Sequence, residues 1–376
     1  MLDLLKIRGQ IDGIDDEILR LFEERMQLCS DVAEFKIQTG KAVFDKDREL
    51  EKLKALGEKA GSDFTSHGIR ELFQQIMAMS RKLQYQLLEK NAVEEDTPYI
   101  PVEALDTENV TVVFQGVEGA YSFAAMNTFF GSSVKNYHVA KFRDAMEEIN
   151  KGNAEYAVLP IENSTAGIVQ DIYDLLTVYD HFIVGEQIIP CQHVLLGVPG
   201  AGLEDIETVY SHPQGLMQCR EFLNEQKGWR QVTLDNTAVS AKKVSEDQDK
   251  SQAAIASESA GEFYGLSVLK KNIFSNRNNS TRFIIVSKEK KYRKDARKIS
   301  VSYELPHESG SLYNSLSHFI YNGLNMTKIE SRPIPGRNWE YRFFVDFEGN
   351  LGDSAVKNAI RGLSVEASQL RVLGNY

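Results

Sequence analysis

Two cations lie on the apolar face of the first predicted helix, where hydrophobic side chains are expected. Residues 7–35 place apolar side chains every three or four positions, which is the spacing of one continuous helical face. Arg25 occupies the position between Leu21 and Leu28 that should continue this face, and Lys36 follows just past its end. Burying a guanidinium is costly unless an anion meets it. A single charge in such a place is most often half of a structural ion pair, so Arg25 alone leaves an ion pair and a ligand site both open.

Further polar residues interrupt the apolar faces of the next two predicted helices. Ser80 and Gln84 fall in the apolar stripe of a helix over residues 69–88. A short helix before it carries a polar cluster at positions i, i+3 and i+4, namely Asp45, Arg48 and Glu49. These residues include no His, no Cys and no metal-ligand set. They predict a pocket inside a helical bundle that binds an anion and stabilises charge, and they suit covalent catalysis poorly.

Helix geometry relates the cations to one another. Arg25 and Lys36 are eleven residues apart, so they project within about 20° of each other and lie roughly 16 Å apart along the axis. Two long side chains in this arrangement can grip a small dianion. Arg8 lies roughly 25 Å before Arg25 and on a different face. If Arg8 serves the same kind of pocket, that pocket belongs to a partner subunit.

Residues 5–87 resemble the all-helical chorismate mutases, in the fused form found at the front of bifunctional enzymes of aromatic biosynthesis. The pocket residues of that family match at Arg8, Arg25, Lys36, Asp45, Arg48, Glu49, Ser80 and Gln84. The resemblance implies that Arg25 and the partner subunit's Arg8 hold the two carboxylates of chorismate. It also implies catalytic roles for Lys36 and Gln84 at the breaking ether bond, and for Glu49 at the ring hydroxyl. A pericyclic rearrangement needs only orientation and electrostatic stabilisation from the protein.

Composition narrows the class of protein. The 376 residues favour two or three domains, and the 42% hydrophobic and 26% charged content is that of a globular protein. A net charge of −11 argues against nucleic-acid and anionic-membrane partners. The chain lacks an apolar run of about 18 residues and a signal-peptide core. Cys29, Cys191 and Cys219 form no zinc pattern and are typical of a reducing compartment. We expect a cytoplasmic protein without metal or cofactor.

Two segments read as linkers. Residues 91–108 are polar and acidic, and residues 287–298 are strongly basic, which favours a solvated linker over an anion-binding patch. The predicted organisation is therefore a helical domain at 1–90, a linker at 91–108, a second domain at 109–287, a linker at 288–298 and a third domain at 299–376.

The middle region alternates strand-like and helical patterns. Strand-like runs occur at 110–114, 156–159, 208–210, 232–234, 253–256 and 283–286. This alternation predicts an α/β domain with largely parallel sheets. Polar motifs lie beside the ends of several strands, where α/β folds bind ligands. These motifs are Gly119-Ala-Tyr-Ser122, Pro160-Ile-Glu-Asn-Ser164, Ser211-His-Pro-Gln214 and Thr281-Arg-Phe283.

The four motifs, in this order, resemble those of prephenate dehydratases. The resemblance implies two α/β lobes related to periplasmic ligand-binding proteins, with a site in the cleft where prephenate loses CO₂ and hydroxide. Thr281 matches the family's essential threonine and is the expected donor to the leaving hydroxyl. The residues expected to bind prephenate with it are Ser122, Asn163, Ser164, Thr165, Ser211, Gln214 and Arg282. Structural interpretations stay open for some residues of this region: Glu162 and Gln214 as helix caps, His212 as a core histidine, and Cys191 and His193 as packing residues.

The last 78 residues predict strands at 299–305, 326–334, 341–347 and 369–373 and helices at 311–321 and 354–361. This order indicates a ferredoxin-like sandwich, and it resembles the ACT regulatory domain of prephenate dehydratases. Glu330-Ser-Arg-Pro333 matches one effector motif, whereas Gly310-Ser-Leu-Tyr313 departs from the other at Tyr313. The implied phenylalanine-binding residues are Gly310, Ser311, Leu312, Glu330, Ser331, Arg332 and Pro333.

The sequence thus indicates a phenylalanine-regulated bifunctional enzyme that acts as a homodimer or larger homo-oligomer. Its substrates would be chorismate and prephenate. Two alternatives remain: an amino-acid-responsive binding protein without catalysis, and an enzyme with one decayed site. A pure sensor has no reason to keep the helical pocket complete, which favours the enzyme.

Overall fold

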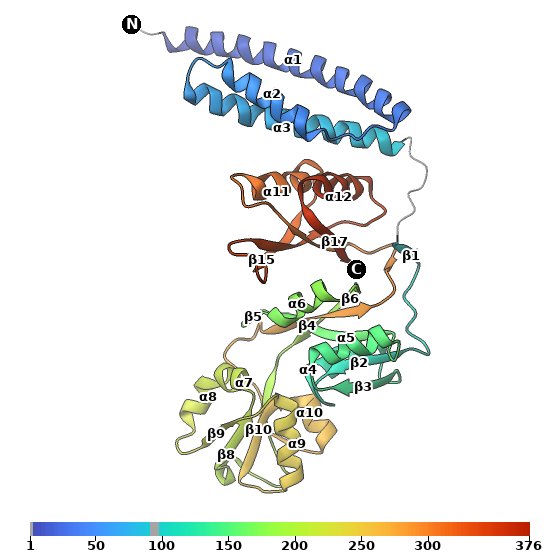
Figure 1. Cartoon of the computed structure of the whole chain (residues 1–376). Helices are drawn as coiled ribbons and strands as arrows, with labels where there is room; N and C mark the ends of the chain where they lie inside the picture. Colours follow the sequence, from blue (N-terminus) through green and yellow to red (C-terminus); the bar gives the residue numbers. More distant parts are fainter. Residues whose placement is uncertain (1–2, 91–97) are drawn as a thin grey trace. The chain divides into compact units, whose positions relative to one another are not determined.

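The computed structural model describes residues 3–90 and 98–376 (Figure 1). The chain forms two compact units. The first unit combines residues 1–97 with 297–372, and the second combines 98–296 with 373–376. Each unit is described by itself.

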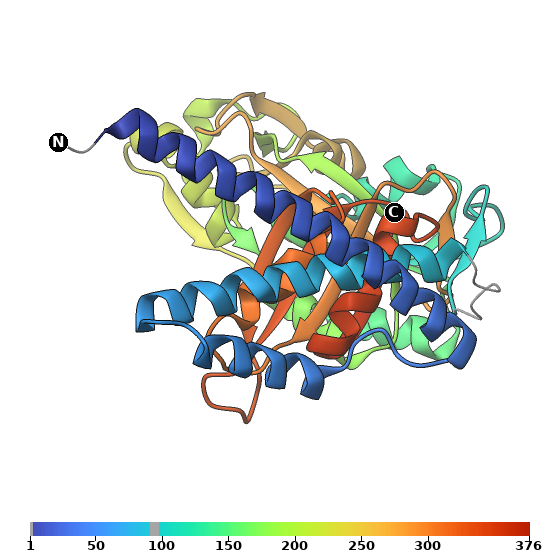
Figure 2. The same cartoon turned by 90° about the horizontal axis from the view of Figure 1, so that it is seen from above.

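Three helices begin the first unit: α1 (Leu4–Thr39), α2 (Lys46–Glu58) and α3 (Asp63–Lys90). The carboxylate of Asp3 accepts hydrogen bonds from two backbone N–H groups of the first turn and thereby caps α1. Asp45 caps α2 in the same way, through the N–H of Arg48. Helix α3 packs against both α1 and α2 (Figure 2).

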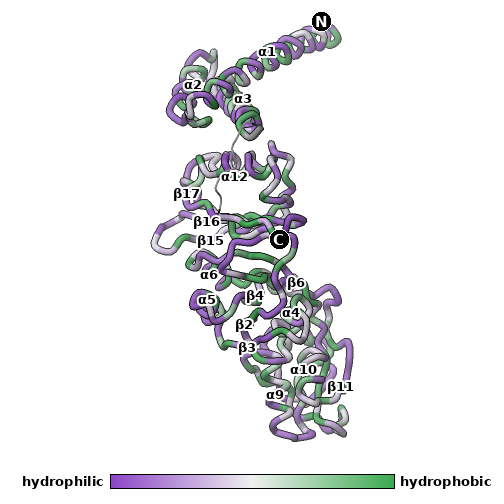
Figure 3. The backbone as a smooth tube through the Cα atoms, turned by 90° about the vertical axis from the view of Figure 1, so that its right-hand side faces the viewer, coloured by the Kyte–Doolittle hydropathy of each residue, from purple (hydrophilic) through white to green (hydrophobic). Residues whose placement is uncertain are grey.

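Most of the apolar face of α1 is not buried by its own chain. Ile14, Ile18 and Leu28 are 54–60% exposed, and Ala33 is the residue of α1 that is buried. Figure 3 shows hydrophobic positions recurring along the whole length of this helix. The apolar periodicity that predicts the helix therefore marks a surface that a single chain leaves open to solvent.

The second unit contains two mixed sheets. One has the strand order β6-β12-β4-β2-β3, with the short β5 beside β4. Its strands are β2 (Thr111–Gln115), β3 (Lys135–Val139), β4 (Tyr156–Asn163), β5 (Gly167–Ile168), β6 (Phe182–Pro190) and β12 (Ser280–Ser287). Its helices are α4 (Tyr121–Phe130), α5 (Phe142–Lys151) and α6 (Gln170–Val178).

The other sheet has the order β11-β7-β10-β8-β9. Its strands are β7 (His193–Gly197), β8 (Thr208–Ser211), β9 (Arg230–Thr233), β10 (Gln252–Ser257) and β11 (Ser267–Lys270). The helical segments are η1 (Leu203–Asp205), α7 (Pro213–Gln218), α8 (Arg220–Glu225), α9 (Thr237–Asp247) and α10 (Glu258–Tyr264).

The prediction of largely parallel sheets is wrong. Strands β2, β3 and β4 are parallel, but β12 runs antiparallel to both β4 and β6. In the other sheet, β8 is parallel to β9 and β10, whereas β7 is antiparallel to β10 and β11. The chain crosses between the sheets from β6 to β7 and back from β11 to β12, and the crossing strands enter against the direction of their neighbours.

Both segments read as linkers contain a strand. β1 (Ile100–Val102) pairs in parallel with β13 (Lys291–Arg293). The basic side chains around β13 are paired with carboxylates: Lys290 Nζ lies 2.9 Å from Asp180, and Lys294 Nζ lies 2.6 Å from Glu103. The basic run is therefore a strand with neutralised charges.

The C-terminal segment has the predicted order of elements. It comprises β14 (Lys298–Glu304), α11 (Ser311–Tyr321), β15 (Met326–Pro333), β16 (Tyr341–Glu348), α12 (Ser354–Glu366) and β17 (Ser368–Asn375). β16 pairs antiparallel with both β14 and β15. The rings of Phe319 and Phe347 are fully buried, with centroids 4.9 Å apart, and tie α11 to the sheet. Helix α12 packs against α11 and against α3 of the same unit.

Candidate functional sites

Polar side chains from α1 and α3 meet within the helical bundle. Arg25 Nη1 donates to Ser80 Oγ, which itself donates to the carbonyl of Ile76 at 2.7 Å. Ser80 and Gln84 are only 4% and 6% exposed. Gln84 Oε1 is buried without a hydrogen-bond partner among the described residues. An unsatisfied buried amide, on the helix that carries the Arg25–Ser80 contact, is a group that a polar ligand could satisfy.

Lys36 lies in the last turn of α1, and Glu49 lies in the first turn of α2. Lys36 Nζ donates to the carbonyl of Val43 at 2.6 Å. Burial lowers the pKa of Lys36, while the nearby carboxylates of Asp45 and Glu49 act in the opposite direction. Glu49 accepts a hydrogen bond from Arg81 Nη1, a contact that the sequence analysis missed. The sequence feature that could have pointed to Arg81 is its position on α3, directly after Ser80.

The remaining mutase residues lie away from these contacts within one chain. Arg8 is exposed near the start of α1, and Arg48 is exposed on α2. Asp45 accepts from the Arg48 N–H at 3.1 Å, so it has a clear role as a helix cap.

A second cavity, of about 380 Å³, is lined by residues from both sheets of the second unit. Several of its lining residues belong to the four motifs or directly flank them: Gly116, Tyr121, Ser122, Pro160, Asn163, His212, Gln214, Thr281 and Phe283. Thr281 and Asn163 are direct neighbours across β12 and β4. The cavity thus gathers segments that are up to 168 residues apart in the chain, from Gln115 to Phe283.

Thr281 is held by two neighbours in this cavity. Asn163 Nδ2 donates to Thr281 Oγ1 at 2.9 Å, and it also lies 3.0 Å from Asn279 Oδ1. Cys191 Sγ lies 3.1 Å from the same hydroxyl oxygen. Burial raises the pKa of Cys191, so the thiol stays protonated at neutral pH. Because the Asn163 amide donates to the hydroxyl oxygen, the Thr281 proton points elsewhere, either to Cys191 Sγ or into the cavity.

A hydrogen-bonded chain of three side chains forms another wall. The Tyr121 hydroxyl lies 3.0 Å from His193 Nδ1, and His193 Nε2 lies 2.8 Å from Gln218 Oε1. Burial lowers the pKa of His193, which keeps the ring neutral near pH 7. An N–H at Nε2 then meets the Gln218 oxygen, and Nδ1 accepts from Tyr121. His193 and Cys191 are buried, as a packing role requires, but they also line the cavity, which the sequence did not predict.

Four predicted prephenate-binding residues do not line this cavity. Ser211 is fully buried and donates to the carbonyl of Ile255 at 2.7 Å. Ser164 and Thr165 are exposed on the loop after β4. Arg282 lies within 3.6 Å of both Glu162 and Glu186, because successive residues of a strand point to opposite faces and Thr281 faces the cavity.

The structure also decides the helix caps left open above. Gln214 lies in the first turn of α7, and its N–H donates to His212 Nδ1 at 3.2 Å. His212 is therefore the cap of α7, and it lines the cavity as well. Glu162 lies in β4 and does not cap a helix.

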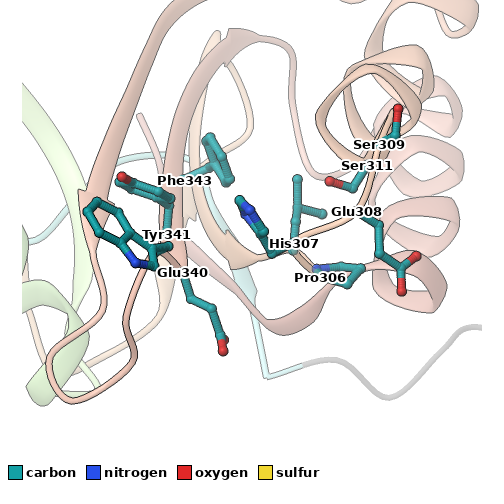
Figure 4. A pocket seen from close by; sticks show the side chains of 10 residues that line it. Pro306, His307, Glu308, Ser309, Ser311, Glu340, Tyr341 and Phe343 are labelled. Carbon is teal, nitrogen blue, oxygen red and sulfur yellow. The ribbon is translucent and has the colours of Figure 1, made fainter.

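A third cavity, of about 320 Å³, lies beside the N-terminus of α11. Its lining includes Ser311, Tyr341 and Phe343, and Figure 4 shows His307 projecting between β16 and the start of α11. Gly310 caps the helix with a φ of 84°, which suits glycine.

The second effector motif forms the end of strand β15, where Glu330 pairs with Phe344 and Pro333 with Tyr341. The motif therefore lies in the strand predicted at 326–334, and none of its four residues from Glu330 to Pro333 lines the third cavity. Pro333 stands at the last position of the strand, where no further ladder bond is needed.

Two features are absent from the described residues, 3–90 and 98–376. No group of three or more His, Cys, Asp or Glu side chains in them has an arrangement that could hold a metal ion. None of their helices is long and apolar enough to cross a membrane.

Known families match both halves of this arrangement. Residues 7–85 match the model of chorismate mutase type II, and residues 112–291 match that of prephenate dehydratase. Bifunctional chorismate mutase/prephenate dehydratases are similar over nearly the whole length. The one from Enterobacter agglomerans is 34% identical, covering 99% of this chain and 95% of its own. The one from Escherichia coli K12 is 32% identical, with 99% and 96% covered.

Solved structures match 71% of this chain. The prephenate dehydratase of Arthrobacter aurescens, in complex with L-Phe, is 32% identical with a TM-score of 0.66, covering 71% of this chain and 89% of that one. The quorum-quenching acylase GqqA is also 32% identical, with a TM-score of 0.64 and coverages of 71% and 97%. The extent of the full-length matches and the order of the two family models lead to one conclusion: the chain belongs to the bifunctional chorismate mutase/prephenate dehydratases.

Proposed function

We propose that the helical site rearranges chorismate to prephenate with residues from two chains. Arg25 and the partner subunit's Arg8 hold the two substrate carboxylates. Lys36 and Gln84 donate to the ether oxygen as its bond breaks. Glu49 accepts from the ring hydroxyl. The burial of Gln84 supports this role, because its amide Nε2 can donate to the ether oxygen in a site shielded from water.

The cavity of the second unit then converts prephenate to phenylpyruvate. The carboxylate bond to the ring breaks, CO₂ leaves, and its electron pair enters the ring as the C–OH bond at the opposite carbon breaks. Thr281 donates to the departing hydroxide, which takes up a proton to become water. The observation that carries this assignment is the Asn163–Thr281 hydrogen bond, since it holds the hydroxyl at the cavity by its oxygen and lets its proton turn from Cys191 Sγ to the substrate. Ser122 and Gln214 line the same cavity as binding residues.

The C-terminal segment is proposed to be a ferredoxin-like ACT domain that binds phenylalanine and lowers dehydratase activity. The L-Phe complex of the Arthrobacter aurescens enzyme supports the identity of the effector. Gly310, Ser311 and Leu312 offer helix N–H groups to its carboxylate. The strand end from Glu330 to Pro333 contributes from a partner subunit in a homodimer or larger assembly.

The expected domains are those given by the sequence, at 1–90, 109–287 and 299–376. The three free cysteines support a cytoplasmic location, where thiols stay reduced.

Feeding chorismate to the purified protein tests the proposal directly. Prephenate should rise first and then fall as phenylpyruvate appears. Prephenate that accumulates without phenylpyruvate would leave a mutase with a decayed dehydratase site. No turnover of either substrate, with phenylalanine still bound, would favour the amino-acid-responsive binding protein.

A further inference from the structure

Arg81 joins two carboxylates that come from opposite ends of the chain. Its Nη1 contacts the Glu49 carboxylate on α2, and its Nη2 lies 3.1 Å from Glu366 Oε1 at the last residue of α12. All three side chains are largely buried, at 11% exposed for Arg81, 23% for Glu49 and 21% for Glu366. The guanidinium also stacks on Phe44, 4.7 Å from the ring centroid. A planar guanidinium fixed in this way can bind two carboxylates at once.

The contacts continue from Glu366 into the C-terminal helices. His318 Nε2 of α11 lies 3.2 Å from the second oxygen of Glu366. Burial alone would raise the pKa of Glu366, but His318 and the positive charges of Arg81 and Lys46 outweigh it and lower the pKa. Glu366 is therefore ionised at neutral pH. An unbroken row of charged or polar contacts leads from Glu49 through Arg81 and Glu366 to α11.

A cavity beside these contacts also reaches the first residues of α11. A cavity of about 210 Å³ is lined by Glu49, Arg81 and Glu366 together with Ser311 and Asn314.

Gln75 precedes Arg81 on α3, and its Nε2 donates to the hydroxyl of Tyr313 at 3.2 Å. Tyr313 is the residue that departs from the usual effector motif, and here it binds the helix that carries Ser80 and Gln84.

We propose that Arg81 is a positioning residue for the mutase reaction, which holds the Glu49 carboxylate in place and couples it to α12. The inference rests on the proposed role of Glu49 in binding chorismate. Chorismate brings two carboxylates, so a third anion in the pocket is costly unless a cation is beside it. Arg81 supplies that charge and occupies one oxygen of Glu49, which leaves the other for the ring hydroxyl.

Glu366 limits how far Arg81 can turn toward Glu49. The guanidinium is shared between two carboxylates. Its contact with Glu366 of α12 therefore determines how the Glu49 carboxylate is oriented toward the substrate. Without Glu366, Arg81 can engage both oxygens of Glu49 and compete with the substrate hydroxyl. A residue of the C-terminal segment, outside the mutase pocket, therefore adjusts the affinity for chorismate. Linkage makes the effect reciprocal, because chorismate binding must then change the strength of the contact between Arg81 and Glu366 of α12.

The test uses Glu366→Gln in the full-length protein, because this variant keeps the shape of the side chain and lies outside the pocket. Mutase kcat and KM are measured beside dehydratase activity, which reports folding in the same sample. The expected result is a KM for chorismate raised about 5-fold or more, with an almost unchanged mutase kcat and intact dehydratase activity. The matched control is Glu71→Gln, which removes an exposed carboxylate of α3 that pairs with His67, and it should change neither constant.

Arg81 is tested by Arg81→Met, which keeps the contact with Phe44, and by Arg81→Lys, which restores the charge. Arg81→Met should lower mutase kcat/KM by about 10–100-fold, less than loss of a direct transition-state donor, and Arg81→Lys should recover part of it. Adding Glu366→Gln to Arg81→Met should have no further effect, because the two act through one contact. A normal KM in Glu366→Gln, or additive effects in the double variant, overturns the inference. Loss of mutase activity in Glu49→Gln would then show that the proposed site still stands.

Discussion

Two amides show how differently the two proposed sites treat a polar side chain. Asn163 donates to Thr281 and to its neighbours in the resting protein, whereas Gln84 Oε1 has no partner among the described residues. A buried polar atom without a partner costs about 1–3 kcal/mol. The dehydratase site is therefore satisfied before substrate binds, and the mutase site stores an unfavourable interaction.

Replacing Gln84 with leucine should separate stability from activity. Gln84→Leu fills the same space and removes the unsatisfied oxygen, so the free energy of unfolding should stay equal or rise by up to about 1–2 kcal/mol. Mutase activity should fall about 10²–10³-fold, as for loss of one preorganised donor. Urea denaturation and mutase assays on the same preparation measure both. A destabilised Gln84→Leu protein would mean that the amide is a structural group.

Thr281→Ala should stop phenylpyruvate formation and leave chorismate turnover intact, so that prephenate accumulates. The reason is that Thr281 supplies the only proposed hydrogen bond to the leaving hydroxide. Thr281→Ser keeps the hydroxyl and serves as the matched control. Product analysis over time distinguishes the variants. Near-normal dehydration by Thr281→Ala would remove this residue from its role.

Individual residues show where sequence reasoning works and where it ends. Thr281 and Asn163 come from separate motifs, and the structure brings them together as expected. Arg282 was placed in the same site because it is adjacent in sequence, but a strand turns neighbouring side chains to opposite faces. His193 was missed because its place in the cavity depends on how the two sheets meet, and a local pattern does not encode that contact.

Helix α1 has an apolar face that its own chain leaves exposed. The same periodicity that predicts the helix leaves Ile14, Ile18 and Leu28 more than half exposed. An uncovered apolar face of this length favours association with another copy. Arg8, which lies outside the pocket of its own chain, would then reach the pocket of the partner.

Mixing two inactive variants tests the shared site. Arg8→Ala and Arg25→Ala should each lose most mutase activity, while dehydratase activity remains. A hybrid dimer has one pocket with an intact Arg25 from one chain and an intact Arg8 from the other, so mixing should restore part of the activity. Subunit exchange is verified by mass spectrometry of differently labelled chains. Complete exchange without recovery would contradict a site built from two chains.

Two of the strands that the sequence analysis did not predict, β1 and β13, share a cause, and β3, β6, β7 and β11 were not predicted either. β1 and β13 are three residues each and find their partners 191 residues away, as the pair Ile100 and Lys291 shows. Pro101 and the basic run both resemble linker composition, so neither strand stands out from its surroundings. The long helices were predictable from their periodicity, and the six strand-like runs of the middle region from their apolar and β-branched residues.

At the scale of the whole molecule, regulation by phenylalanine must be reciprocal. If phenylalanine lowers the affinity for prephenate, prephenate must lower the affinity for phenylalanine by the same factor. Calorimetric titration of the intact protein with phenylalanine, in the absence and presence of saturating prephenate in the inactive Thr281→Ala background, should show a dissociation constant raised about 5–150-fold. Equal constants in both titrations would contradict an allosteric link between the two sites.

The discontinuity of the first unit has a consequence during synthesis. Its helices are complete by residue 90, but the strands and helices that share the unit begin near residue 297. At about 5–20 residues per second, the ribosome needs roughly 10–40 s to cover that interval. During this time α3 has no α12 to pack against. Arg81 can contact Glu49, but Glu366 has not yet been synthesised. Almost all of the second unit is synthesised during this interval. The first unit therefore begins first but is among the last parts of the protein to be completed.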